Sequence, residues 1–144
     1  MVLFDVNVLI YATRKQSADH KRYHAWLEQL VDGDGAFAIS DLVLSGYLRI
    51  VTNPKVFAKP ARLSDAIEVC DRIRGRPNCV AVQPGPRHWD IFLDLCRRAS
   101  ARGNLVPDAF LAALAIESGS EWLTTDRDYA RFPGLRWRHP LAER

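Results

Sequence analysis

The first seven residues, Met1-Val-Leu-Phe-Asp5-Val-Asn7, decide the expected fold, because a short apolar run ends abruptly in a carboxylate. Residues 2–5 predict a buried strand, and residues 7–12 predict a helix directly after it. A similar stretch occurs far downstream, where Trp122-Leu-Thr-Thr125 leads into Asp126 and then Asp128. The carboxyl ends of parallel strands form the ligand-binding edge of an α/β sheet. We therefore expect Asp5 and Asp126 at the same edge.

Strand and helix patterns alternate along the rest of the chain. Apolar runs predict further strands at residues 36–40, 79–82, 122–124 and 135–137. Helical periodicity covers residues 20–30, 41–51, 62–73, 86–101 and 108–117. This alternation predicts an α/β fold, a three-layer α/β/α sandwich with a central, mostly parallel sheet of four or five strands. We expect one domain, residues 1–144, in which the first and fourth strands are neighbours at the point where the winding reverses.

Composition narrows the class of protein. The formal net charge is +3 and the pI is about 8.9, which is mildly basic. Three cysteines without CxxC spacing favour a reducing compartment, and we expect the cytoplasm. The longest apolar run falls well short of the twenty or so residues that span a bilayer, so we expect no membrane segment.

A third acid stands in a comparable setting. Asp108 follows Pro107 and precedes the apolar run Ala109-Phe-Leu-Ala-Ala113, so it is either a helix cap or a metal ligand. Carboxylates that converge repel one another unless some take up protons or a cation neutralises them. Oxygen ligands suit a hard divalent ion such as Mg²⁺ or Mn²⁺. Asn7, two residues after Asp5, is equally open to a cap or a ligand-orienting role.

Basic and histidine side chains supply weaker signals. Arg127, Arg131 and Arg136 lie among aromatic residues, a combination that suits phosphate and unpaired bases, although a solvated surface is the simpler explanation for any one of them. His20 and His24 have the i, i+4 spacing of metal ligands, but their charged surroundings favour a solvent or interface role.

Four stretches together resemble a PIN-domain ribonuclease of the VapC toxin type. They are Phe4-Asp5-Val-Asn7-Val-Leu-Ile-Tyr-Ala12, Asn104-Leu-Val-Pro-Asp108-Ala-Phe-Leu-Ala-Ala113, Thr124-Thr-Asp126-Arg-Asp128-Tyr129 and Phe132-Pro-Gly-Leu-Arg136-Trp137. The resemblance implies Mg²⁺- or Mn²⁺-dependent cleavage of RNA and a cognate antitoxin of the VapB kind. It also implies that Asp5 and Asp108 are metal ligands and that Asp126 completes the acidic pocket.

One position departs from that family. Its members commonly carry a glutamate on the helix after the second strand, where this chain has Gly46. Glycine inside a helix costs up to about 1 kcal/mol relative to alanine, so close packing or room for substrate must favour it. Asp41 and Asp128 are the two candidates to replace the missing acid. Asp41 is also a candidate N-cap of its own helix.

The expected function is therefore a metal-dependent endoribonuclease toxin neutralised by an antitoxin. The alternative is a catalytically weakened PIN-like module that binds RNA or protein, with Gly46 as the trace of decay. Other hydrolase patterns, such as GxSxG or a glycine-rich phosphate loop, do not occur. We also expect a homodimer. The candidate positions for a dimer face or antitoxin groove, with core as the alternative, are Tyr47, Ile50, Val56 and Phe57.

Overall fold

The computed structural model describes residues 1–142, and its centre is a five-stranded sheet in which every neighbouring pair of strands is parallel. The strand order is β3-β2-β1-β4-β5. The strands are β1 (Val2–Phe4), β2 (Phe37–Ile39), β3 (Cys79–Ala81), β4 (Glu121–Leu123) and β5 (Trp137–Arg138). The predicted parallel sheet is confirmed, with strand bounds that shift by one or two residues.

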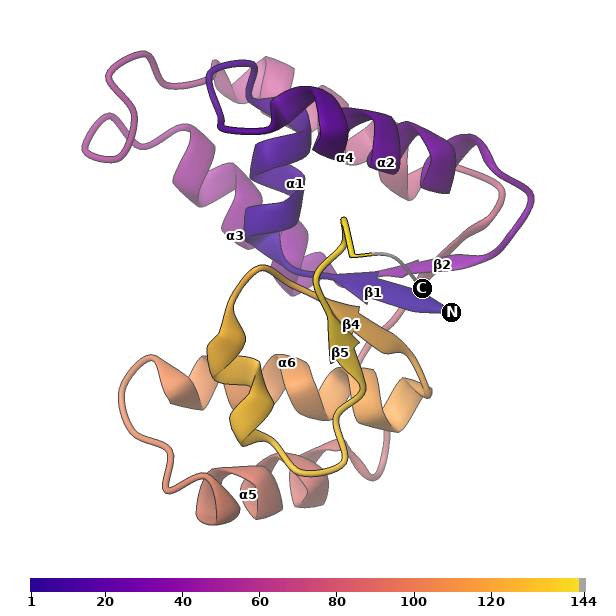
Figure 1. Ribbon diagram of the computed structural model, residues 1–144, viewed down its shortest axis with the longest axis vertical. Helices are drawn as coiled ribbons and strands as arrows, with labels where there is room; N and C mark the ends of the chain where they lie inside the picture. The colour runs from indigo at the N-terminus through magenta and orange to yellow at the C-terminus, as the bar shows by residue number, and fades with distance from the viewer. Residues whose placement is uncertain (143–144) are drawn as a thin grey trace.

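Helices cover both faces of the sheet, as Figure 1 shows. On one face lie α1 (Val6–Thr13), α2 (His20–Asp32), α3 (Asp41–Val51) and α4 (Leu63–Arg74). On the other face lie α5 (His88–Arg98) and α6 (Leu105–Ser118). A short 3-10 helix, η1 (Arg127–Arg131), follows β4. The predicted three-layer α/β/α sandwich is confirmed.

Strand β1 lies at the centre of the sheet and sets the position of the acids. Leu3 is paired with Ala38 of β2 on one side and with Trp122 of β4 on the other. The expectation that the first and fourth strands are neighbours is therefore confirmed. Because all strands point the same way, the residues that follow β1 and β4 emerge side by side at one edge.

Helix α6 is apolar around most of its circumference because it lies between the sheet and α5. Its buried residues are mostly alanine and leucine, and small side chains let the helix approach the sheet closely. The helix begins at Leu105, three residues before the predicted start at Asp108. Pro107 is tolerated there because the N–H groups of a first helical turn need no intrahelical partner. Asp108 is therefore inside the first turn and is not the N-cap.

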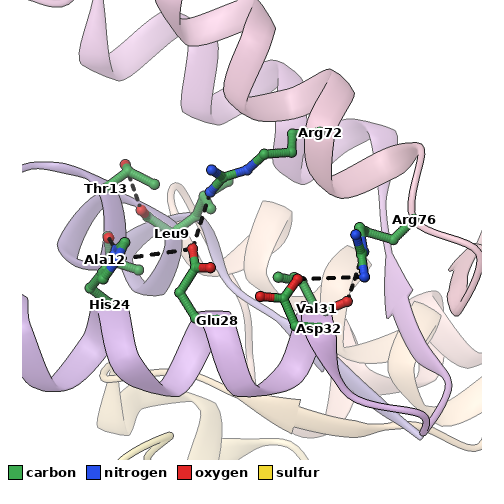
Figure 2. Close-up of polar contacts among 9 residues, drawn as sticks. All are labelled: Leu9, Ala12, Thr13, His24, Glu28, Val31, Asp32, Arg72 and Arg76. Atoms are coloured by element: carbon green, nitrogen blue, oxygen red, sulfur yellow. Dashed lines mark hydrogen bonds and ion pairs between the residues drawn. The ribbon is translucent and has the colours of Figure 1, made fainter.

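The end of α1 is held by two histidines of α2. The Nδ1 atoms of His20 and His24 donate to the carbonyl oxygens of Tyr11 and Ala12 at 2.9 and 3.2 Å. Figure 2 shows His24 beside Glu28, which also pairs with Arg72 of α4 at 3.2 Å. These histidines satisfy carbonyl groups that a helix C-terminus leaves without partners. Their contacts join helices within the fold.

Two further features are the length of the apolar helices and the state of the cysteines. Within residues 1–142, none of the helices is long and apolar enough to cross a bilayer. Cys70, Cys79 and Cys96 are free thiols.

Candidate active site

Asp5 ends β1 and also caps α1. Its backbone N–H donates to the carbonyl oxygen of Leu123 at 2.9 Å, which keeps the end of β1 joined to β4. One carboxylate oxygen accepts the N–H of Val6 and the other accepts the hydroxyl of Thr124, each at 2.8 Å. Only 9% of Asp5 is exposed. The helix therefore begins one residue earlier than predicted, and Asp5, not Asn7, is its cap.

Asp108 accepts a hydrogen bond from a tyrosine 21 residues later in the chain. The hydroxyl of Tyr129 donates to Asp108 Oδ1 at 3.2 Å. Asp108 is half-buried, whereas Tyr129 is 1% exposed. Burial, followed by the nearby carboxylates, raises the pKa of Tyr129 above its usual range, so its hydroxyl stays a donor. The contact joins α6 to η1.

Asp126 follows β4 and begins η1. Its side chain accepts the N–H of Asp128 at 2.9 Å, and its own N–H donates to the hydroxyl oxygen of Thr124 at 3.1 Å. Thr124, which is fully buried, therefore contacts both Asp5 and Asp126. Thr124 therefore holds in place the two acids that follow β1 and β4.

The charges of these acids act on one another. The pKa of Asp5 is raised to about 6, first by burial and then by the charges of Asp108 and Asp126, and the hydrogen bonds that Asp5 accepts lower it only in part. The pKa of Asp108 is also raised, again first by burial, and the charges of Asp126 and Asp128 contribute. The nearby charges that act most strongly on the two pKa values are those of other aspartates. The structure thus brings the three predicted acids into one negative field.

The acids are close but are not already arranged as a cage. In the described part of the chain, no group of three or more His, Cys, Asp or Glu side chains forms a ready metal-binding cluster. The oxygen Oδ1 of Asn7 is buried and has no hydrogen-bond partner among the described residues. A buried polar atom without a partner costs about 1–3 kcal/mol, so it requires a reason. A carboxylate-rich, oxygen-only set with one unpaired amide oxygen fits a hard divalent cation.

Gly46 is explained by close packing. A Cβ atom on Gly46 would lie 3.1 Å from Val6 Cγ2, which is tighter than ordinary van der Waals contact. Val6 directly follows Asp5, so a larger residue at position 46 would press on a side chain next to the first acid. Of the two expectations for this glycine, close packing is the one that the contact supports, although the neighbour is a side chain and not backbone.

The two candidate replacements for the missing acid differ in location. Asp41 is exposed, and Arg74 pairs with both of its oxygens at 2.8 and 3.3 Å. The hydrogen bond from Arg74 lowers the pKa of Asp41, and none of the site aspartates contributes. Ser40, not Asp41, caps α3, so that cap prediction is wrong. Asp128 is also exposed, but its charge reaches Asp108, so it lies closer to the acidic field.

The three arginines do not gather in one place. Arg127 and Arg131 are exposed on η1, the helix that Asp126 begins. Arg136 donates to the carbonyl oxygen of Gly119, just after α6, at 2.9 Å. It borders a hollow with Met1 at the amino ends of the strands, so the structure does not bring it to the acids.

The positions proposed for a partner surface also divide. Tyr47 is 2% exposed and its hydroxyl is 2.8 Å from Thr13 Oγ1, so it is core and the expected exposure is wrong. Ile50 and Phe57 are half-buried, and Val56 is 55% exposed.

Two side chains of the site carry roles that the sequence analysis did not assign. Thr124 and Tyr129 supply the hydroxyls that fix Asp5 and Asp108. The only sequence signal was their place in Thr124-Thr-Asp126-Arg-Asp128-Tyr129, beside the third acid.

Comparison with known proteins gives consistent matches over nearly the whole chain. The family model "PIN domain" matches residues 2–135. Ribonuclease VapC43 of Mycobacterium tuberculosis is 43% identical over 141 residues, which cover 98% of this chain and 96% of that protein. Ribonuclease VapC25 of the same organism is 36% identical over 140 residues, covering 97% and 99%.

Solved structures show the same fold at low sequence identity. VapBC2 from Rickettsia felis, bound to a DNA fragment from its promoter, has a TM-score of 0.69 at 20% identity and covers 96% of this chain and 98% of the other. Mycobacterium tuberculosis VapC20, a sarcin-ricin loop cleaving toxin, has a TM-score of 0.67 at 14% identity, with coverage of 94% and 99%.

Proposed function

The chain belongs to the PIN-domain family, and on this basis we propose that it is a metal-dependent endoribonuclease toxin that a cognate VapB-like antitoxin holds inactive. The observation that carries the proposal is the shared negative field of Asp5, Asp108 and Asp126 at the carboxyl edge of the sheet. The names of the relatives supply the reaction, because VapC43 and VapC25 are ribonucleases.

Asp5, Asp108 and Asp126 would hold the ion, and Asn7 Oδ1 offers a further oxygen or a contact for a bound water. A bound Mg²⁺ or Mn²⁺ supplies Lewis acidity toward a phosphoryl oxygen and lowers the pKa of a water that attacks the phosphorus. The hydrogen bonds from Thr124 and Tyr129 keep one oxygen of Asp5 and one of Asp108 in place. Preorganised carboxylates lose less entropy when a cation binds.

The arginines of η1 supply the RNA contact. Arg127 and Arg131 are exposed beside Asp126, where guanidinium groups can bind the phosphates that flank the cleaved bond. Arg136 is bound to the opposite edge and is not part of this proposal.

The partners follow from the same site. A basic antitoxin side chain, an arginine above all, would find unpaired carboxylates in Asp5 and Asp108. A toxin–antitoxin complex from Klebsiella pneumoniae has the same fold, with a TM-score of 0.64 at 18% identity. We further propose a homodimer that uses the exposed Val56 and the adjacent Phe57, and a cytoplasmic location in keeping with three free thiols.

The test is cleavage of a structured RNA by the purified full chain. Cleavage should require millimolar Mg²⁺ or Mn²⁺, stop with EDTA, and be lost in Asp108→Asn and Asp126→Asn. The matched control is Asp41→Asn, which removes an exposed carboxylate outside the acidic field and should retain activity.

The replacement of the family glutamate by Gly46 favours one other candidate, a PIN-like module that binds RNA or protein without cutting. RNA binding by the wild-type chain without cleavage, under every metal condition, would support that module and refute the ribonuclease proposal.

A further inference from the structure

We propose that Tyr129 is a positioning residue of the metal site, whose hydroxyl fixes Asp108 relative to Asp126 and thereby sets the affinity for a divalent cation. The inference rests on the proposed function, because it assumes that these acids bind an ion. Neither the sequence pattern nor the family resemblance assigns a role to this tyrosine.

The geometry leaves the hydroxyl of Tyr129 little freedom. The residue is 1% exposed, and its ring packs against Trp122 at 5.3 Å and against Phe132 at 5.8 Å between centroids. The Phe132 contact is edge-on, at 62°. Because the ring is buried and packs against two aromatic neighbours, its position is restricted, and its hydroxyl lies 3.2 Å from Asp108 Oδ1.

Tyr129 also joins two separate parts of the site. It belongs to η1, the helix that Asp126 begins and that contains Asp128. Asp108 belongs to α6, and the hydrogen bond from Tyr129 spans 21 residues of sequence. The tyrosine is therefore a fixed bridge between the acid of α6 and the acids of η1. The separation of these carboxylates decides how well a single cation can contact both.

The hydroxyl acts on one oxygen only. It donates to Asp108 Oδ1, so the lone pairs of Oδ2 are not taken up by this hydrogen bond and would be available to a cation. Residues that hydrogen-bond to metal ligands orient them, and their loss typically lowers metal affinity or activity by about 10–100-fold. Without the hydroxyl, Asp108 could rotate and would lose entropy each time an ion bound. We expect Tyr129→Phe to weaken Mn²⁺ binding about tenfold.

A purely structural role for the hydroxyl must be separated from this one, and the chain offers a matched control. Tyr47 is also a buried tyrosine, 2% exposed, and its hydroxyl is 2.8 Å from Thr13 Oγ1. The site aspartates do not contribute to its pKa, so it lies outside their field. Tyr47→Phe removes an equivalent buried hydroxyl and keeps the ring. Both variants should therefore have a slightly lower melting temperature than the wild type.

The experiment is a Mn²⁺ titration of the full chain by calorimetry, with RNA cleavage measured over the same range of Mn²⁺. For Tyr129→Phe we expect the dissociation constant to rise about tenfold, the cleavage curve to shift by the same factor, and the rate at saturating Mn²⁺ to stay within about threefold of wild type. For Tyr47→Phe both curves should match the wild type.

Three results would overturn the inference. If the wild type binds Mn²⁺ and cuts RNA but Tyr129→Phe has the same dissociation constant, Tyr129 has only a structural role and the proposed function stands. The same holds if Tyr129→Phe and Tyr47→Phe weaken binding equally. If the wild type neither binds Mn²⁺ nor cuts RNA, the proposed function and this inference both fail.

Discussion

Replacement of Asp5 by asparagine should stabilise the metal-free protein at neutral pH. The carboxylate of Asp5 is buried, is repelled by two other acids, and has a pKa raised from 3.8 to about 6. Each unit of pKa shift corresponds to about 1.4 kcal/mol, so ionised Asp5 costs the folded state about 3 kcal/mol. Asparagine has nearly the same shape and no charge, and its oxygen can still accept the N–H of Val6.

The sign of the pH dependence follows from the direction of the shift. A carboxyl group whose pKa is raised on folding stabilises the folded state fully below its unfolded pKa of 3.8, and that stabilisation is lost as the pH rises through about 6. Wild type and Asp5→Asn should therefore be similar near pH 4 and diverge up to pH 7. The full difference of about 3 kcal/mol is an upper bound, because asparagine offers Thr124 an amide in place of an acceptor oxygen.

The assay is urea unfolding of both proteins in EDTA, at intervals between pH 4 and pH 8. In a thermal melt the same difference corresponds to roughly 6–12 °C. Excess Mn²⁺, at a hundred times its dissociation constant, should add about 2.7 kcal/mol to the wild type and little to the variant. If Asp5→Asn is less stable than the wild type at pH 7.5 in EDTA, burial and repulsion by the other acids do not make the ionised Asp5 destabilising.

Three other changes test separate contacts. Asp41→Asn should have the opposite sign, with a small loss of stability at neutral pH that urea unfolding can detect, because Arg74 lowers the pKa of Asp41 and favours its ionised form. Glu117→Ala should lower the unfolding free energy by about 0.5–1.5 kcal/mol, because Glu117 accepts the N–H groups of Gly85 and Arg87, just before α5, at 2.6 and 2.8 Å. Asn78→Ala should cost about 1–3 kcal/mol in the same assay, because the two N–H groups of its amide serve three backbone carbonyls, of Leu30, Gly33 and Gly35.

The meeting of Asp5 and Asp126 could be predicted from sequence because it depends only on strand order. Asp5 directly follows an apolar strand and Asp126 follows one by three residues, and parallel strands bring their carboxyl ends to one edge of the sheet. Asp108 was harder to place, since the proline at position 107 suggested a helix that begins after it. The helix instead takes the proline into its first turn, where a missing N–H has no cost.

The hydroxyl contacts of Thr124 and Tyr129 lay beyond any sequence pattern. The contact of Thr124 depends on how β4 lies beside β1, and that of Tyr129 depends on the separation of η1 and α6 and on the packing of its ring against Trp122 and Phe132. The ion pair of Asp41 was equally hard to predict, because its partner Arg74 lies 33 residues later in the chain, on another helix. Local propensity says nothing about such pairs.

The contact between Gly46 and Val6 bears on any attempt to restore the acid that the family commonly has at position 46. A Cβ atom there would lie 3.1 Å from Val6 Cγ2, so Gly46→Glu requires the Val6 side chain to give way by a few tenths of an ångström. Val6 donates its N–H to Asp5, so that shift would take place next to a carboxylate of the site. A smaller residue at position 6 would relieve the contact, and a protein engineer who wants a fourth carboxylate should compare Gly46→Glu alone with the double change.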